Sequence, residues 1–131
     1  MTNEQTSQEA LVTALSTPNV WRPPSVEDQP SVTLTRWTVI RCEFEDGTTS
    51  DHAVGYCGTG RVTSAIKERR PDTGEIVTRS GRVYKLSGSP GLNMDAAYVW
   101  DYWARANRVQ KETDVRKEYY EEILSAETGL D

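Results

Sequence analysis

The chain has 131 residues, of which 27% are charged and 36% hydrophobic, and its formal net charge at pH 7 is −5. This length is typical of one folded domain, and no apolar run is long enough to cross a bilayer. Because phosphates repel an acidic surface, we expect no direct binding of duplex nucleic acid. The opening MTNEQTSQEA lacks the basic and apolar blocks of a secretory signal, so we expect a cytoplasmic protein without a membrane segment.

Residues 1–30 have the composition of an arm rather than of a core. The run TSQEALVTALS predicts a short helix, and residues 17–30 then hold four prolines, which makes that stretch extended and irregular. Trp21 stands within the proline-rich stretch. A ring of this size favours packing either on the folded domain or on a partner, and both interpretations stay open.

Residues 31–131 are expected to form a single α+β domain. Alternating apolar and polar residues over 31–88 predict an antiparallel β-meander of about five strands. Turns containing glycine separate the strands, as in EDGTT, GTG and PDTGE. The expected strands cover residues 31–45, 50–57 and 61–70, followed by a hairpin over 76–88.

The C-terminal third predicts helix, and its tryptophans predict that the helix packs on the sheet. The first helical segment covers residues 93–109, with Asn93 or Asp95 as its N-cap and its two tryptophans mainly in the core. A second segment begins after Thr113 as its expected N-cap. Whether the two segments form one helix or break near Asn107 stays open.

Cys42 and His52 are the residues that could supply a nucleophile and a base. A two-residue loop at Asp46-Gly47, which this dipeptide favours, pairs Cys42 with Asp51 and puts His52 on the opposite face of the sheet. A three-residue loop would instead place Cys42 opposite His52. The first register is the expected one, so Cys42 is predicted to be a small buried hydrophobe, and we assign no catalytic residue.

Other cofactor and metal signatures are weak. The chain has one histidine and two cysteines, and the cysteines lack C-x-x-C spacing, which argues against a metal site. The glycine clusters GYCGTGR and GSPG do not lead into a helix in the way that nucleotide-binding loops do. We therefore expect no cofactor, and reduced thiols at Cys42 and Cys57.

Residues 61–85 hold seven basic and three acidic residues, a net charge of +4 in a chain whose remainder is −9. If Ser80-Gly81 is a two-residue hairpin loop, Arg79 pairs with Arg82 and both share a face with Tyr84. Such a face can bind phosphate, carboxylate or a stacked base. Exposure to solvent and docking on the acidic C-terminal segment or another subunit are the alternatives. The candidate contact residues are Arg79, Arg82, Tyr84, Arg61, Arg69, Arg70 and Trp21.

The segments GRVTSAI, TRSGRVYKLSG and AAYVWDYW resemble pieces of uncharacterised small proteins from proteobacteria and their phages, over residues 60–103. Small acidic phage proteins often act by binding, including as anti-CRISPR-like antagonists of host defence. Together with four tryptophans and six tyrosines, residue types that favour interfaces, the resemblance implies a non-enzymatic interaction protein. Its expected partner is a protein, such as a host nucleic-acid-handling or defence component.

Two alternative functions follow from other residues. A small-ligand protein would hold a nucleotide or other anion through Arg79 and Arg82, with Arg61 or Arg69. A cysteine-dependent enzyme would use Cys42 and His52. A homodimer through an uncovered sheet edge or the C-terminal helix is also expected to be feasible.

Overall fold

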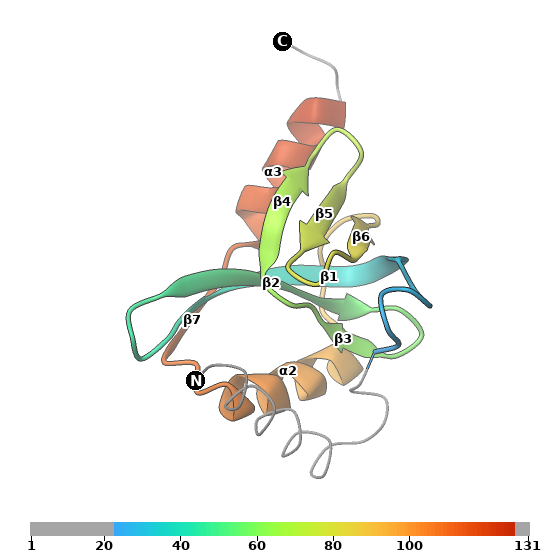
Figure 1. Cartoon of the computed structure of the whole chain (residues 1–131). Helices are drawn as coiled ribbons and strands as arrows, with labels where there is room; N and C mark the ends of the chain where they lie inside the picture. The colour runs from blue at the N-terminus through green and yellow to red at the C-terminus, as the bar shows by residue number, and fades with distance from the viewer. Residues whose placement is uncertain (1–22, 128–131) are drawn as a thin grey trace.

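The computed structural model of the chain describes residues 23–127, which form a seven-stranded mixed sheet and two helices (Figure 1). The strands are β1 (Ser31–Glu43), β2 (Thr49–Tyr56), β3 (Gly60–Val62), β4 (Ile66–Arg70), β5 (Glu75–Thr78), β6 (Val83–Leu86) and β7 (Lys111–Asp114). The helices are α2 (Met94–Ala106) and α3 (Arg116–Glu127). The α+β class is confirmed. Trp21 and the short helix predicted before it lie outside the described residues.

The sheet differs from the predicted meander in the direction of one strand pair. Its order is β3-β2-β1-β6-β5-β4, and β7 pairs with β1 off this path. β1 and β6 run parallel, whereas every other paired strand is antiparallel. Apolar alternation reports which face of a strand is buried and not the direction of its neighbour, so the sequence pattern does not separate the two cases.

The segment 61–70, expected as one strand, is divided between β3 and β4 by a corner. Thr63 N donates to Ala53 O of β2 at 3.0 Å, and Arg79 N donates to Ala65 O at 2.8 Å, so the corner is bonded to β2 on one side and to the β5–β6 loop on the other. The two ends of the strand order are therefore joined by a short piece of chain, and the sheet curls back toward itself.

β1 changes the face that it buries at Arg36. This residue has a φ of +46°, and the register with β2 shifts between Thr35 and Thr38. An extra residue of this kind is a β-bulge, which reverses the alternation of side chains. Leu34 before the bulge and Trp37 after it consequently both point into the same core, where each is fully buried.

The two helices cover opposite faces of the second half of β1. Val39 belongs to the core closed by α3, whereas Cys42 belongs to the core closed by α2. The α3 core contains Val32, Leu34, Trp37, Val39, Ala53, Ile76, Tyr84, Leu86 and Tyr119. The α2 core contains Cys42, Val54, Ala96, Trp100 and Ala104. The predicted packing of a tryptophan-bearing helix on the sheet is thus present in α2. A second helix, α3, packs on the other face, and the exposed strand β7 separates the two helices along the chain (Figure 1).

α2 begins as predicted and lies against β3 without a side chain between them. The Asn93 side chain accepts a hydrogen bond from Ala96 N at 2.9 Å, which makes Asn93 the N-cap. A Cβ at Gly60 would lie 2.5 Å from Asp95 O. Only glycine permits this approach of the two backbones. Thr113, the predicted cap of the second helix, lies in β7 instead.

The C-terminal end of α2 is closed by a Schellman motif around Arg108, which has a φ of +56°. Val109 N donates to Ala104 O at 3.0 Å and Arg108 N donates to Arg105 O at 3.2 Å. This pair of bonds satisfies carbonyl groups that the helix leaves open, and the middle position normally prefers glycine.

We expect Arg108→Gly to raise the free energy of unfolding by about 1 kcal/mol, because glycine adopts a positive φ without steric cost. Urea denaturation followed by circular dichroism measures the change. Arg105→Gly, inside α2, is the matched control and should lower stability by roughly 1 kcal/mol. A decrease for Arg108→Gly would contradict the assignment of the motif.

Candidate functional site

The hairpin of β5 and β6 has a register one residue away from the predicted one. Thr78 N donates to Arg82 O at 3.1 Å, so the loop has three residues, and Gly81 takes a φ of +92°. Tyr84 consequently pairs with Ile76. A slip of one residue exchanges the two faces of a strand. The prediction that Arg79, Arg82 and Tyr84 form one exposed face is therefore wrong.

Arg82, Tyr84 and Arg61 form a buried cluster instead, each with at most 4% of its surface exposed. Arg82 Nε donates to Gln29 O at 2.8 Å, and Arg82 Nη2 donates to Pro24 O. Arg61 Nη2 donates to Gln29 Oε1 at 3.2 Å, and both guanidinium groups contact the Tyr84 hydroxyl. The cluster fastens residues 24–29 to the sheet and leaves these three candidates without an outward binding surface.

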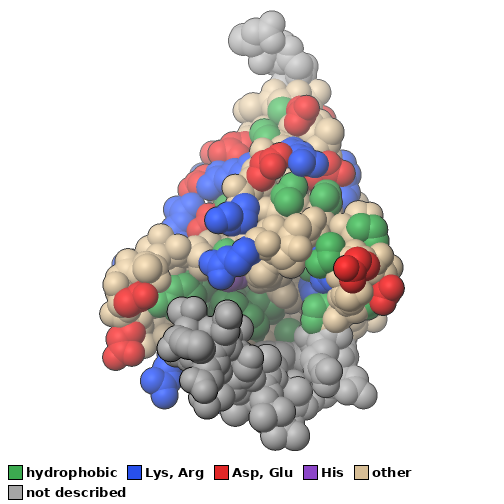
Figure 2. Space-filling model, viewed as in Figure 1, with side chains coloured by type: hydrophobic (Ala, Val, Ile, Leu, Met, Phe, Trp, Pro, Cys, Tyr) green, Lys and Arg blue, Asp and Glu red, His purple; other side chains and the backbone are tan. Residues whose placement is uncertain are grey.

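The remaining candidates separate into three environments. Arg69 and Arg70 of β4 form ion pairs, the first with α3 and the second with Glu68 on its own strand. Charged side chains of both signs intermix over this half of the molecule (Figure 2). Arg79, in the β5–β6 loop, is exposed and lines a cleft. Among the predicted contact residues that the structure describes, Arg79 is therefore the only one that is exposed and forms no ion pair.

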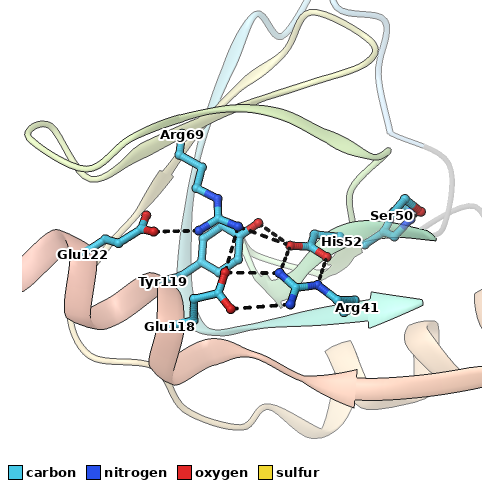
Figure 3. Close-up of polar contacts among 8 residues, drawn as sticks. Arg41, Ser50, His52, Arg69, Glu118, Tyr119 and Glu122 are labelled. Atoms are coloured by element: carbon cyan, nitrogen blue, oxygen red, sulfur yellow. Dashed lines mark hydrogen bonds and ion pairs between the residues drawn. The ribbon is translucent and has the colours of Figure 1, made fainter. Parts of the chain in front are cut away.

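Arg69 belongs to an ionic network that joins α3 to the sheet (Figure 3). It bonds Glu118 at 2.9 Å and Glu122 at 2.8 Å, and its guanidinium lies 4.0 Å from the centre of the Tyr119 ring. Arg41 of β1 bonds Glu118 at 3.1 Å from the other side. Docking on the acidic C-terminal helix, one of the alternatives for Arg79 and Arg82, is thus found for Arg69 instead.

Asp51 is the half-buried centre of this network. It accepts two hydrogen bonds from Arg41, at 2.8 and 2.9 Å, and one from the Tyr119 hydroxyl at 2.6 Å. Burial alone raises the pKa of the Asp51 carboxyl, but the bonds from Arg41 and Tyr119 outweigh burial and hold this pKa below its ordinary value. Burial and the bond to Asp51 raise the pKa of Tyr119, which keeps its hydroxyl a donor.

Cys42 and His52 lie on one face of the sheet, contrary to the predicted register. The loop of the β1–β2 turn is Glu45-Asp46-Gly47, closed by a hydrogen bond from Phe44 N to Thr48 O. Cys42 therefore pairs with Ser50, which is neither of the two partners that the sequence predicted. Burial, followed by the nearby Glu112 and Asp51 carboxylates, raises the pKa of the Cys42 thiol to about 12. A buried protonated thiol is a poor nucleophile. Cys42 and Cys57 are both free, as predicted.

His52 is hydrogen-bonded to Ser50, a residue that the sequence analysis did not single out. The Ser50 hydroxyl lies 2.6 Å from His52 Nε2, and His52 Nδ1 lies 2.9 Å from Thr63 O. A carbonyl only accepts, so Nδ1 carries the proton and Nε2 accepts from Ser50. Burial lowers the pKa of His52, which favours this neutral form. The Ser-x-His spacing on a strand was the available signal, because residues i and i+2 share a face.

The outer face of α2 exposes large apolar side chains. Met94 and Tyr98 are 77% and 55% exposed, and Leu92, just before the helix, is 68% exposed. Met94, Tyr98 and Tyr102 follow one another at intervals of four residues, and the two tyrosine rings lie 5.3 Å apart. Helical residues spaced by four share one side. α2 therefore has one side packed on the sheet and an aromatic, apolar side facing outward.

Comparison with known proteins gives no match to a protein-family model, a curated protein or a solved structure. Over residues 23–127, no helix is both long and apolar enough to cross a membrane. In the same part of the chain, no group of three or more His, Cys, Asp or Glu side chains is arranged to hold a metal ion. The geometry of the described residues is thus the basis for assigning a function.

We expect Asp51→Asn to lower the free energy of unfolding at pH 7 by about 1–3 kcal/mol, because the charged partner of Arg41 and Tyr119 is lost. A carboxyl whose folded pKa is lowered stabilises the fold above its unfolded pKa of about 4, and this contribution disappears as the pH falls through the folded pKa. Urea denaturation at pH 7, 5 and 3 should therefore show a shallower acid loss for the variant than for the wild type.

The control for this experiment is Asp72→Asn, an exposed carboxyl in the β4–β5 loop, which should change stability by no more than about 0.5 kcal/mol. Parallel pH profiles for the wild type and Asp51→Asn would show that Asp51 is not the centre of the network.

Proposed function

We propose that this chain is a non-enzymatic interaction protein that binds a protein partner through the outer face of α2. The observation that carries the proposal is the exposure of Leu92, Met94 and Tyr98, each more than half exposed, on a helix whose other side is already packed. Exposed apolar residues that gather in one patch are typical of binding surfaces. Tyrosine and methionine are also enriched at the centres of interfaces.

The arrangement favours recognition of a helix face by a groove. Met94, Tyr98 and Tyr102 supply the side chains at positions i, i+4 and i+8 that such a groove accepts. α2 is already held in place by Trp100 and by the close backbone contact at Gly60. A helix that is ordered before binding loses little conformational entropy on binding, which favours affinity.

The charges beside this face define the chemistry of the partner. Asp95 is exposed in the first turn of α2, Asp101 is paired with Arg105 at 2.6 Å, and the chain as a whole carries −5. Complementary charge favours an apolar groove bordered by lysine or arginine. A protein that handles nucleic acid in the host cytoplasm has surfaces of this kind, which fits the resemblance of residues 60–103 to phage and proteobacterial proteins and a role as an antagonist of such a protein.

We expect the double variant Met94→Ser/Tyr98→Ser to weaken binding of the partner by about tenfold or more, because it removes two apolar contacts at the centre of the face. The full chain captures the partner from proteobacterial cells, and titration of the purified partner with the purified chain then gives the dissociation constant. The matched control is Leu124→Ser on α3, which removes an apolar side chain that is 39% exposed and should leave the affinity unchanged.

Three results would overturn the proposal. The first is a purified partner that binds the wild type and the double variant with equal affinity. The second is a partner whose binding Leu124→Ser weakens as much as the double variant does. The third is a stable homodimer of the wild type, measured by sedimentation, that is not formed by the double variant. The last result would assign the α2 face to a second copy of the chain.

A further inference from the structure

A cleft of about 530 Å³ opens where the β1–β2 turn, the corner at residues 63–65, the β5–β6 loop and the C-terminal end of α2 meet. Hydrophobic side chains lie in a recess on this face of the molecule, with basic side chains directly above it (Figure 2). A volume of this size is within the range of small-molecule sites. Its lining includes Phe44, Ser50, His52, Arg79, Trp103 and Arg108.

Two exposed arginines from distant parts of the chain line this cleft. Arg79 comes from the β5–β6 loop, and Arg108 is held there by the positive φ that closes α2. Neither guanidinium forms an ion pair or a side-chain hydrogen bond with the residues at 23–127, in contrast to Arg41, Arg69 and Arg116. Guanidinium groups with unused donors bind oxyanions such as phosphate and carboxylate.

The inner wall of the cleft is neutral and partly apolar. Trp103 and Phe44 are half-buried there, and the Trp103 ring lies 4.5 Å from that of His52. Because His52 Nδ1 donates to Thr63 O and Nε2 accepts from Ser50, the histidine contributes no charge. An aromatic wall of this kind favours a flat ring in the ligand.

The two carboxylates at the rim limit the negative charge that a bound ligand can carry. Glu45 and Asp46 line the cleft in the β1–β2 turn, and Asp46 already accepts hydrogen bonds from Thr48 N at 3.0 Å and Thr48 Oγ1 at 2.7 Å. These carboxylates balance the charge of the two arginines. A polyanion such as a nucleic acid strand would meet repulsion at this rim, whereas a compact ligand with one anionic group would not.

We propose that this cleft binds a small molecule that carries a planar ring and one phosphate or carboxylate group. Arg79 and Arg108 hold the oxyanion, and the ring packs against Trp103 and Phe44. The site does not depend on the α2 docking face, because Trp103 lies on the side of α2 that meets the sheet, where it contacts His52, whereas Tyr98 lies on the outer side. Either proposal stands if the other fails.

The test is titration of the full chain with adenosine 5′-monophosphate and with indole-3-acetate, followed by isothermal calorimetry and by amide chemical shifts. We expect saturable binding of at least one of the two, with shifts at Ser50, Arg79 and Trp103. Arg79→Ser and Arg108→Gly should each weaken that binding by about fivefold or more, as expected for loss of one charge-assisted contact. Arg108→Gly is expected to be more stable than the wild type, so unfolding does not explain its loss of affinity.

The matched control is Arg70→Ser, which removes an exposed arginine on β4 without touching the cleft. Its affinity should equal that of the wild type. The proposal is overturned if neither probe binds saturably, if Arg70→Ser weakens binding as much as Arg79→Ser, or if adenosine binds as tightly as its monophosphate. Inorganic phosphate that binds as tightly as both probes would also overturn it, because the ring would then contribute nothing.

Discussion

A single backbone conformation at Arg36 determines how β1 can serve the whole sheet. This strand pairs with β2, β6 and β7, so its side chains must fit a core along its entire length. Regular alternation would turn either Leu34 or Trp37 into solvent, and each of these side chains is fully buried. The bulge removes the conflict at a cost of about 1–3 kcal/mol for a non-glycine residue with positive φ. Burial of one large apolar side chain stabilises the fold by a similar amount, about 1.5–3 kcal/mol, which offsets the cost of the bulge.

The fold uses most of its central basic residues for its own stability. Burial of a guanidinium group is costly unless its donors are satisfied, and Arg82 meets this requirement with two main-chain carbonyls and a tyrosine hydroxyl rather than with a carboxylate. Arg69 is satisfied by the glutamates of α3. These contacts hold the N-terminal segment and the last helix on the sheet. Arg79 and Arg108 have no such contacts among the described residues, and they are the two arginines of the proposed anion site.

The sequence was sufficient for the α+β class, the cap at Asn93 and the burial of Trp100, because each depends on local chemistry or on the period of a helix. Both hairpin registers were wrong for one shared reason. In EDG and in RSG the glycine takes the positive φ as the third loop residue, although the same dipeptides fit a two-residue loop. The local sequence permits both loops, and burial of distant residues such as Tyr84 selects one. The error made the buried pair Arg82 and Tyr84 look like part of an outward binding surface. Ser50 was missed independently of this error, because its spacing from His52 is set within one strand and not by the register between strands. β7 was missed because KETD has no apolar residue to reveal a strand.

The composition of β7 has a consequence for association of the chain with itself. This short strand lies beside the second half of β1, and all four of its side chains are exposed. A further strand added at that edge would place its side chains next to Lys111, Glu112 and Asp114, and an apolar strand would find no apolar surface there to pack against. Short, charged borders of this kind protect natural sheets from uncontrolled aggregation. The protein can therefore expose an aromatic helix face while the charged edge strand β7 disfavours aggregation through strand pairing.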